Sequence, residues 1–221
     1  MIVLQWKYRD RTHAGKVLAE ELLQLELNAL PLVLAVPNGG VAVAVPIARA
    51  LGAELNVVIV RKLQIPYNPE AGFGALTSLG TLMLNKPLVA RLGLTEKEID
   101  SVKRKTERQI EERRKIYEGL IGHTEPLGRA VILVDDGLAS GYTMMAAIDS
   151  VRVFHPESVT VAVPTAHDSS ARMVEAAVDG LVCPRIETGF VFAVANAYQN
   201  WYDVSDSEVI EVLHQAADAV T

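Results

Sequence analysis

The 221-residue sequence predicts an α/β fold: a doubly wound, mainly parallel sheet flanked by helices. Short apolar, β-branched runs alternate with helical stretches along the chain, which is typical of repeated strand–helix units. Half of the residues are hydrophobic and only 5% are aromatic, so the core must be largely aliphatic, as in a buried parallel sheet. We expect one domain over residues 1–221, with a core at about 30–165, a lid at about 64–85, and a small hood built from the N-terminal helix and residues 184–221.

The expected elements follow this alternation in order. Residues 12–27 place Val17, Leu18, Leu22 and Leu25 at helical spacing among charges, which predicts an amphipathic first helix. Strands are predicted at residues 32–36, 55–60, 130–134, 159–163 and 181–183, and further helices at residues 41–51, 95–120, 142–154, 169–177 and 206–219. Ligands of such sheets bind beyond the carboxyl ends of the strands, so the loops after the strands are the places to look for function.

Residues 64–85 interrupt the alternation. Prolines and glycines flank the apolar stretch FGALTSLGTLML, a pattern that predicts a mobile loop leading into a β-hairpin. We interpret this segment as a lid. The helix after it opens with Thr95 and Glu98 in the spacing of a capping box.

Charge and cysteine content exclude several classes of partner. A net charge of -6 disfavours nucleic acid, so an anionic ligand has to be held by a local pocket. The single cysteine, Cys183, forms no intrachain disulfide and suits a reducing compartment. The apolar start of the chain is too short for a secretory signal, and no apolar run reaches the roughly 18 residues of a spanning helix. We therefore expect a cytoplasmic protein without a membrane partner.

Residues 131–143, VILVDDGLASGYT, carry the strongest functional signal. An apolar strand is followed directly by the start of a helix, where unpaired backbone amides and the helix dipole favour an anion. Gly137 and Gly141 allow a ligand to approach the backbone closely, and Ser140 and Thr143 add hydroxyl donors. This combination predicts a phosphate-binding loop.

Two acidic residues distinguish this loop from an ordinary phosphate cradle. Asp135 and Asp136 would repel a polyphosphate but can accept hydrogen bonds from two neighbouring sugar hydroxyls. A phosphate beside a diol describes ribose 5-phosphate. The alternative is a plain strand-to-helix turn with an aspartate cap, which does not require all of these residues together. A Walker loop needs Lys where Tyr142 stands, and PNGG at residues 37–40 lacks the Rossmann pattern of glycines.

With these residues in place, the sequence resembles the type I phosphoribosyltransferase family. VILVDDGLASGYT is similar to its signature for 5-phosphoribosyl 1-pyrophosphate (PRPP), PNGG resembles its pyrophosphate loop, and Arg61 and Lys62 end the second strand. The resemblance covers about residues 32–164. The segments VRKL, NPEAGFGA and FAVANAYQNWYDVSDSEV look like an uncharacterised branch of predicted phosphoribosyltransferases.

The resemblance implies a set of site residues. The PRPP-binding residues would be Asn38, Gly39, Gly40, Asp135, Asp136, Gly137, Ala139, Ser140, Gly141, Tyr142 and Thr143. Asp135 and Asp136 would hold Mg²⁺ directly or through water, and Arg61 or Lys62 would supply positive charge to the pyrophosphate. Glu70 in the lid is a candidate general acid or base, or alternatively an exposed loop carboxylate.

Two positions depart from the family pattern, and the acceptor side is open. Ala139 stands where hypoxanthine-guanine enzymes have an acidic residue, and Asn38 where close relatives often have a cation. A flat base would stack on a hood drawn from His167, Phe190, Phe192, Tyr198, Trp201 and Tyr202, although core packing of the aromatic residues and an ordinary loop position for His167 are the alternatives.

The resemblance implies transfer of the phosphoribosyl group from PRPP to a nitrogenous base, with a nucleobase of nucleotide salvage as the default. A PRPP-binding regulator without turnover is the first alternative, and a phosphoribosyl hydrolase or phosphatase is the second. Relatives are usually dimers, so we expect a homodimer.

Overall fold

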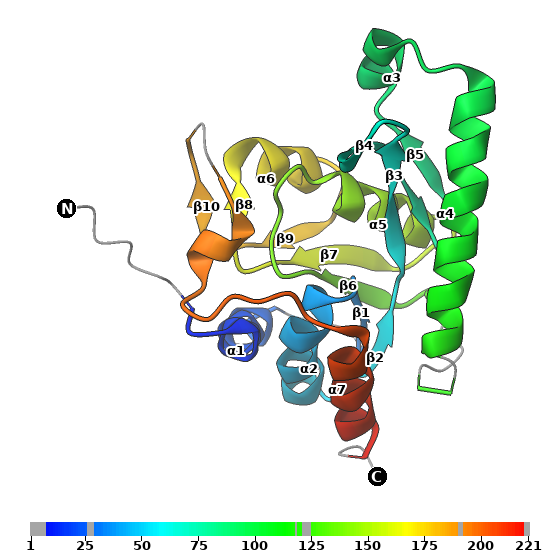
Figure 1. Cartoon of the computed structure of the whole chain (residues 1–221). Helices are drawn as coiled ribbons and strands as arrows, with labels where there is room; N and C mark the ends of the chain where they lie inside the picture. Colours follow the sequence, from blue (N-terminus) through cyan, green and yellow to red (C-terminus); the bar gives the residue numbers. More distant parts are fainter. Residues whose placement is uncertain (1–7, 26–28, 118, 121–124, 190–191, 219–221) are drawn as a thin grey trace.

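A five-stranded parallel sheet forms the centre of the computed structural model, which describes residues 8–25, 29–117, 119–120, 125–189 and 192–218, without the side chains of residues 69, 70 and 216–218. Its strands lie in the order β2 (Glu54–Val57), β1 (Leu32–Ala35), β6 (Ala130–Val134), β7 (Ser158–Ala162) and β9 (Gly180–Val182) (Figure 1). All four pairings are parallel. The predicted fold class is confirmed.

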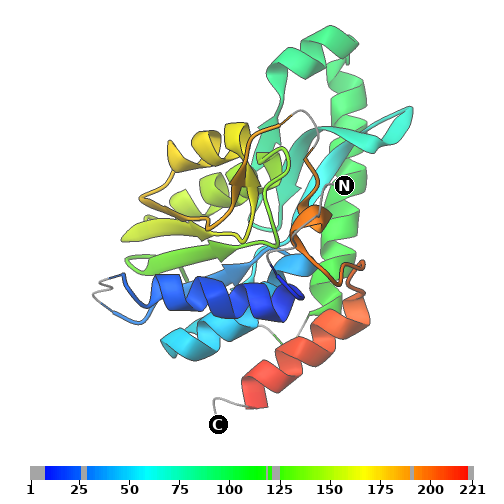
Figure 2. The same ribbon diagram turned by 90° about the vertical axis from the view of Figure 1, so that its left-hand side faces the viewer.

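Helices cover both faces of this sheet. The helices α1 (Arg11–Leu22), α2 (Gly39–Leu51) and α7 (Asp206–Asp218) lie on one face, and α5 (Tyr142–Arg152) and α6 (Asp168–Glu175) lie on the other (Figures 1 and 2). Successive strand residues point to opposite faces. Val33 and Ile132 therefore pack in the core with α1 and α2, whereas Val131 and Leu133 pack with α5 and α6.

A second, antiparallel sheet consists of β3 (Val60–Ile65), β4 (Asn68–Thr77) and β5 (Leu82–Leu84), followed by α3 (Lys86–Leu92) and α4 (Glu96–Ile116). The single strand predicted at residues 55–60 is wrong, because the chain leaves the parallel sheet after Val57 and starts β3 at Val60. Helix α3 was missed, although Asn85 accepts a hydrogen bond from the Leu88 amide as its N-terminal cap. The capping box of Thr95 and Glu98 is confirmed.

The segment 64–85 differs from the expected loop in its first half, which is extended and paired in β3 and β4. Its glycines reflect close packing: a Cβ on Gly74 would lie 2.3 Å from the carbonyl oxygen of Met83, and one on Gly72 would lie 2.1 Å from Cγ of Lys62. Glycine is therefore needed here for room between strands.

The first described residue pairs with the segment before α7. The Tyr8 amide donates to the carbonyl of Ala197 in the short 3-10 helix η1 (Val194–Ala197), at 3.0 Å. The strands β8 (Ala166–His167) and β10 (Ile186–Glu187) form a small separate pair nearby. Within the described residues, none of the helices has the length and apolar character needed to cross a membrane.

Candidate active site

The loop after β6 brings its acidic pair and its glycines to the carboxyl end of the sheet. Leu138 anchors the loop: its amide donates to the Thr165 carbonyl at 2.9 Å, and its carbonyl accepts from the His167 amide at 3.0 Å. Leu138 is buried, whereas Ala139 and Ser140 next to it are exposed. The anchor therefore presents the following turn to solvent.

Gly141 then turns the chain into α5 with a left-handed φ of 76°, a backbone conformation that favours glycine. Helices α2 and α5 have no side-chain cap, while the residue before each of α1, α3, α4 and α6 caps its helix with a side chain. The first amides of a helix need an external acceptor. Ser205 likewise accepts from the Glu208 amide at the start of α7. Among the α-helices of the described chain, the two without a side-chain cap, α2 and α5, thus begin in the two loops predicted to bind phosphate groups.

The acidic pair is partly buried and is linked to the N-terminal helix. The Asp136 Oδ2 atom accepts from Nε of Arg11 at 2.9 Å, and the side chains are 17% and 7% exposed. Asp135 Oδ1 accepts from the Asp136 amide at 2.8 Å. Burial raises the pKa of Asp135 well above its ordinary value, and the Asp136 charge raises it further. Burial also raises the pKa of Asp136, although Arg11 acts in the opposite direction.

The loop Pro37–Gly40 packs directly against this pair, with a cis peptide bond between Pro37 and Asn38. A Cβ on Gly39 would lie 1.9 Å from Oδ2 of Asp136, and one on Gly40 would lie 2.7 Å from the carbonyl oxygen of Val134. The two loops that the sequence singled out thus touch each other. The glycines are required because no side chain fits between them.

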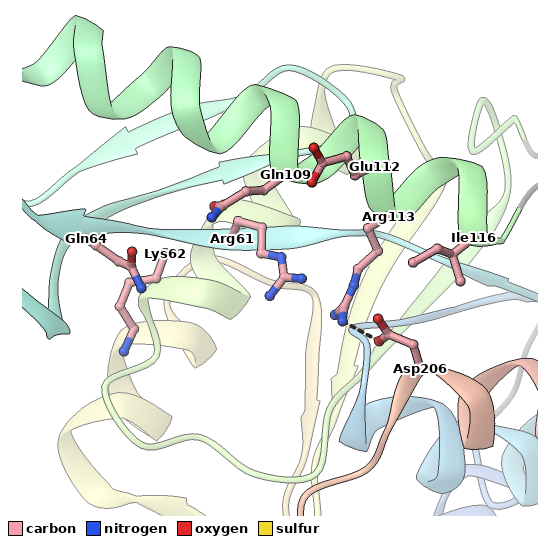
Figure 3. Close-up of a pocket in the computed structure, with 8 residues that line it drawn as sticks. All are labelled: Arg61, Lys62, Gln64, Gln109, Glu112, Arg113, Ile116 and Asp206. Atoms are coloured by element: carbon pink, nitrogen blue, oxygen red, sulfur yellow. Dashed lines mark hydrogen bonds and ion pairs between the residues drawn. The ribbon is translucent and has the colours of Figure 1, made fainter.

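Arg61 and Lys62 line a cavity of about 490 Å³ between β3, α4 and the start of α7 (Figure 3). Gln64, Gln109, Glu112, Arg113, Ile116 and Asp206 complete the lining. Figure 3 shows the guanidinium groups of Arg61 and Arg113 extending toward the same space, where Arg113 pairs with Asp206. Burial lowers the pKa of Arg61, and the Arg113 charge lowers it further.

Asn38 connects this cavity to the acidic loop. Its Oδ1 accepts from Nη1 of Arg113 at 2.6 Å. Its Nδ2 donates to the carbonyl of Val204 at 2.7 Å and to Oδ1 of Asp206 at 2.9 Å. Asn38 was expected to bind PRPP. In the structure its side-chain amide instead holds α4 and the segment before α7 to the loop.

Two of the six base candidates, His167 and Tyr198, have hydrogen-bond partners within the protein. His167 caps α6, and its ring nitrogens lie 2.7 Å from Oγ of Ser169 and 2.9 Å from the Gly189 carbonyl. Tyr198 is buried, and its hydroxyl donates to the Asp136 carbonyl at 2.7 Å. Tyr198 therefore supports the acidic loop and offers no open face for a base.

The other four base candidates differ in their surroundings. Trp201 and Tyr202 are 37% and 54% exposed and lie beside Arg11, whose guanidinium carbon is 4.1 Å from the centre of the Trp201 indole. Phe192 packs edge-on against His167. Phe190 lies outside the described residues. Glu70 belongs to β4, but its side chain is not part of the described structure.

Sequence reasoning missed Arg11 and Arg113, although each carries a recognisable signal. Arg11 lies on the buried stripe of α1 with Ala14, Leu18 and Leu22. Arg113 lies between Ile110 and Tyr117 on the inner face of α4, at spacings of three and four residues. A cation on the apolar stripe of a helix needs an anionic partner at depth, and that requirement could have identified both residues.

Comparison with known proteins agrees with this geometry. A family model described as "Phosphoribosyl transferase domain" matches residues 75–199. A protein of Mycobacterium tuberculosis strain H37Rv, provisionally named a phosphoribosyl transferase, is 36% identical over 209 residues, which are 95% of this chain and 47% of that protein; its counterpart in strain CDC 1551 matches equally. The chain thus spans about half the length of these curated relatives.

Two solved structures extend the comparison. The protein TT1426 of Thermus thermophilus is 35% identical with a TM-score of 0.79, covering 95% of this chain and 98% of that one. AQ2163 of Aquifex aeolicus, at 12% identity and a TM-score of 0.52 over 85% of each chain, shares the fold. The family match covers more than half of the sequence and includes the acidic loop, and we conclude that this chain belongs to the phosphoribosyl transferase family.

Proposed function

We propose that the protein transfers the 5-phosphoribosyl group of PRPP to a nitrogenous base and releases pyrophosphate. One observation carries the proposal: the acidic pair lies between two uncapped helix starts, one in each of the two glycine loops. PRPP has the matching order of groups, with phosphate at one end, a diol in the middle and pyrophosphate at the other end.

Each part of the site has a role in this proposal. The turn at residues 139–143, exposed at Ala139, Ser140 and Tyr142, binds the 5-phosphate with backbone amides and the hydroxyls of Ser140 and Thr143. Asp135 and Asp136 hold the ribose hydroxyls, and Gly39 and Gly40 offer amides to the pyrophosphate. Bond breakage at C1 builds negative charge on the leaving pyrophosphate, so fixed donors near that group accelerate the reaction most.

The acidic pair fits a magnesium ion. Two adjacent, partly buried carboxylates face one arginine, and burial raises the pKa of both, so the site lacks positive charge. The described residues contain no group of three or more potential metal ligands, so water and PRPP oxygens would complete the coordination shell. When bound, Mg²⁺ would neutralise charge on the pyrophosphate.

The acceptor would be a nucleobase stacked on Trp201 and Tyr202, the exposed aromatic residues beside the acidic loop. Orienting this base in line with the C1–pyrophosphate bond is the main contribution of such a surface. The homodimer, the cytoplasmic location and the acid–base role of Glu70 stay predictions.

A direct assay tests the function. The protein is incubated with PRPP and Mg²⁺, with and without a panel of nucleobases, and pyrophosphate release is measured. Release that depends on a base is expected. Release without any base would identify a hydrolase, and saturable PRPP binding without release would identify a regulator; both outcomes contradict the proposal.

A variant pair connects the assay to the site. Asp135→Asn removes one carboxylate while keeping both Arg11 and Asp136, and it should abolish base-dependent release. Asp149→Asn removes an exposed carboxylate on α5 and should leave release unchanged. Normal turnover by Asp135→Asn would exclude the acidic pair from the active site.

A further inference from the structure

The cavity beside β3 has the charge pattern of an anion-binding site. Three cationic side chains, those of Arg61, Lys62 and Arg113, line it together with two carboxylates, those of Glu112 and Asp206, so positive charge is in excess. The cations come from two different elements, β3 and α4, and the guanidinium groups of Arg61 and Arg113 extend toward one space (Figure 3). Packing like charges together is unfavourable unless an anion is also bound.

An unpartnered polar atom points to the same place. Among the described residues, three buried side-chain nitrogen or oxygen atoms lack a hydrogen-bond partner, and two of them belong to Arg61 and Tyr117. Arg61 is part of the cavity lining, whereas Tyr117 is fully buried and is not among the residues that line the cavity. A buried donor without an acceptor is costly, so Arg61 Nε favours an added acceptor in the cavity.

Arg113 is fixed in this cluster from two sides. Asn38 Oδ1 accepts from Nη1 at 2.6 Å, and Asp206 pairs with Nη2. Asn38 immediately precedes Gly39, which touches the acidic pair. The guanidinium is therefore anchored next to the glycine loop that begins α2, although it comes from a distant helix.

From this arrangement we infer that Arg113 binds the pyrophosphate group of PRPP directly, and that Asn38 is the residue that positions its guanidinium. This inference rests on the proposed function. Asn38 holds one nitrogen of Arg113 and so turns the fork toward the cavity. Arg61 donates to the same anion. Arginine suits this role because its planar fork matches phosphate oxygens.

Calorimetric binding tests the role of Arg113, with magnesium pyrophosphate, PRPP and ribose 5-phosphate as separate probes. Arg113→Gln should weaken the binding of pyrophosphate and of PRPP by about tenfold or more, because it removes charge-assisted hydrogen bonds. The same substitution should leave the affinity for ribose 5-phosphate unchanged, since that ligand lacks the pyrophosphate. Arg113→Lys should recover part of the lost affinity.

The matched control is Arg114→Gln on the same helix. The Arg114 side chain is 58% exposed and pairs loosely with Glu111, so all three affinities should match the wild type. Pyrophosphate affinity in Arg113→Gln equal to that of the control would overturn the inference. Loss of ribose 5-phosphate binding in both Arg113 variants would overturn it as well, because the residue would then support the loops.

A double-mutant cycle tests the positioning role of Asn38. Asn38→Ala should weaken pyrophosphate binding in the wild type and have no further effect in Arg113→Gln. Equal losses in both backgrounds would contradict the role. These measurements need no acceptor base, so they stand even if no base supports transfer. Conversely, base-dependent turnover by Arg113→Gln at the wild-type rate would keep the function and reject Arg113.

Discussion

At the scale of single residues, Gly39 determines how closely the two site loops approach each other. The space that a Cβ would need is already occupied by the Asp136 carboxylate, at 1.9 Å from Oδ2 and 2.5 Å from Cγ. Arg11 Nε lies 3.0 Å from the same point. Even one methyl group would therefore separate the loop from the ion pair behind it.

Gly39→Ala should accordingly weaken PRPP binding by about tenfold or more and lower the free energy of unfolding by about 1–3 kcal/mol. Gly189→Ala is the control, because nothing lies within 4 Å of the Cβ it would add. Calorimetry and urea unfolding measure the two effects. If Gly39→Ala binds PRPP with wild-type affinity, the close approach of the two loops is not needed for PRPP binding.

The residues that the sequence identified are those whose chemistry is local. Asp135, Asp136 and Gly141 lie within one short loop, so their order along the chain already describes the site. Arg11 and Arg113 reach it only through tertiary packing, and their partners Asp136 and Asp206 are distant in sequence. Linear spacing identifies a loop, but it does not show which helix folds back to neutralise it.

At the scale of elements, α1 and the segment before α7 form a clamp around the acidic loop. Arg11 in the first turn of α1 pairs with Asp136, and its Nη1 donates to the Tyr202 carbonyl at 2.9 Å. Its guanidinium also lies against the Trp201 ring, a favourable cation–π contact. The acidic loop is therefore held by elements from opposite ends of the chain.

Arg11→Met should lower the free energy of unfolding by about 3 kcal/mol, because it leaves the buried Asp136 carboxylate without its cation. Arg9→Met breaks the neighbouring ion pair between Arg9 and Asp10. Because the Arg9 side chain is 64% exposed, the free energy of unfolding should fall by less than about 1 kcal/mol. Urea unfolding of both variants measures the difference. Similar small losses of unfolding free energy in both variants would show that Arg11 is not needed to stabilise the buried Asp136 carboxylate.

The order of elements in the parallel sheet was largely predictable, whereas the antiparallel sheet was not. Each parallel strand is an apolar run followed by a helix, and that pattern is local. The sequence has no such signal at the boundary between β2 and β3, because residues 54–65 form strand throughout except at residues 58–59. Only the partner strands show that the chain has changed sheets.

At the scale of the whole molecule, the acidic pair makes stability depend on pH. Burial raises the pKa of Asp135 and Asp136 above the ordinary 3.8, so the folded state holds protons that the unfolded chain has released. The pair therefore favours folding most below the ordinary pKa. This contribution is lost as the pH rises through the raised pKa values of the folded state.

Asp135→Asn cannot ionise, so it should gain stability relative to the wild type as the pH rises from about 4 to about 8 without ligand. Urea unfolding at several pH values gives the difference between the two proteins. Asp100→Asn, which removes an exposed carboxylate on α4, corrects for general loss of charge. A difference between Asp135→Asn and the wild type that stays constant with pH would show that the pair carries no buried charge.

The clamp around the acidic loop also affects the order of events during translation. A nascent chain that has emerged through β9 already contains all five parallel strands. Arg11 acquires the Trp201 ring and the Tyr202 carbonyl only when later residues leave the ribosome. The scaffold can therefore assemble while synthesis continues, and the contacts around the acidic loop become complete only after residues 201 and 202 have emerged.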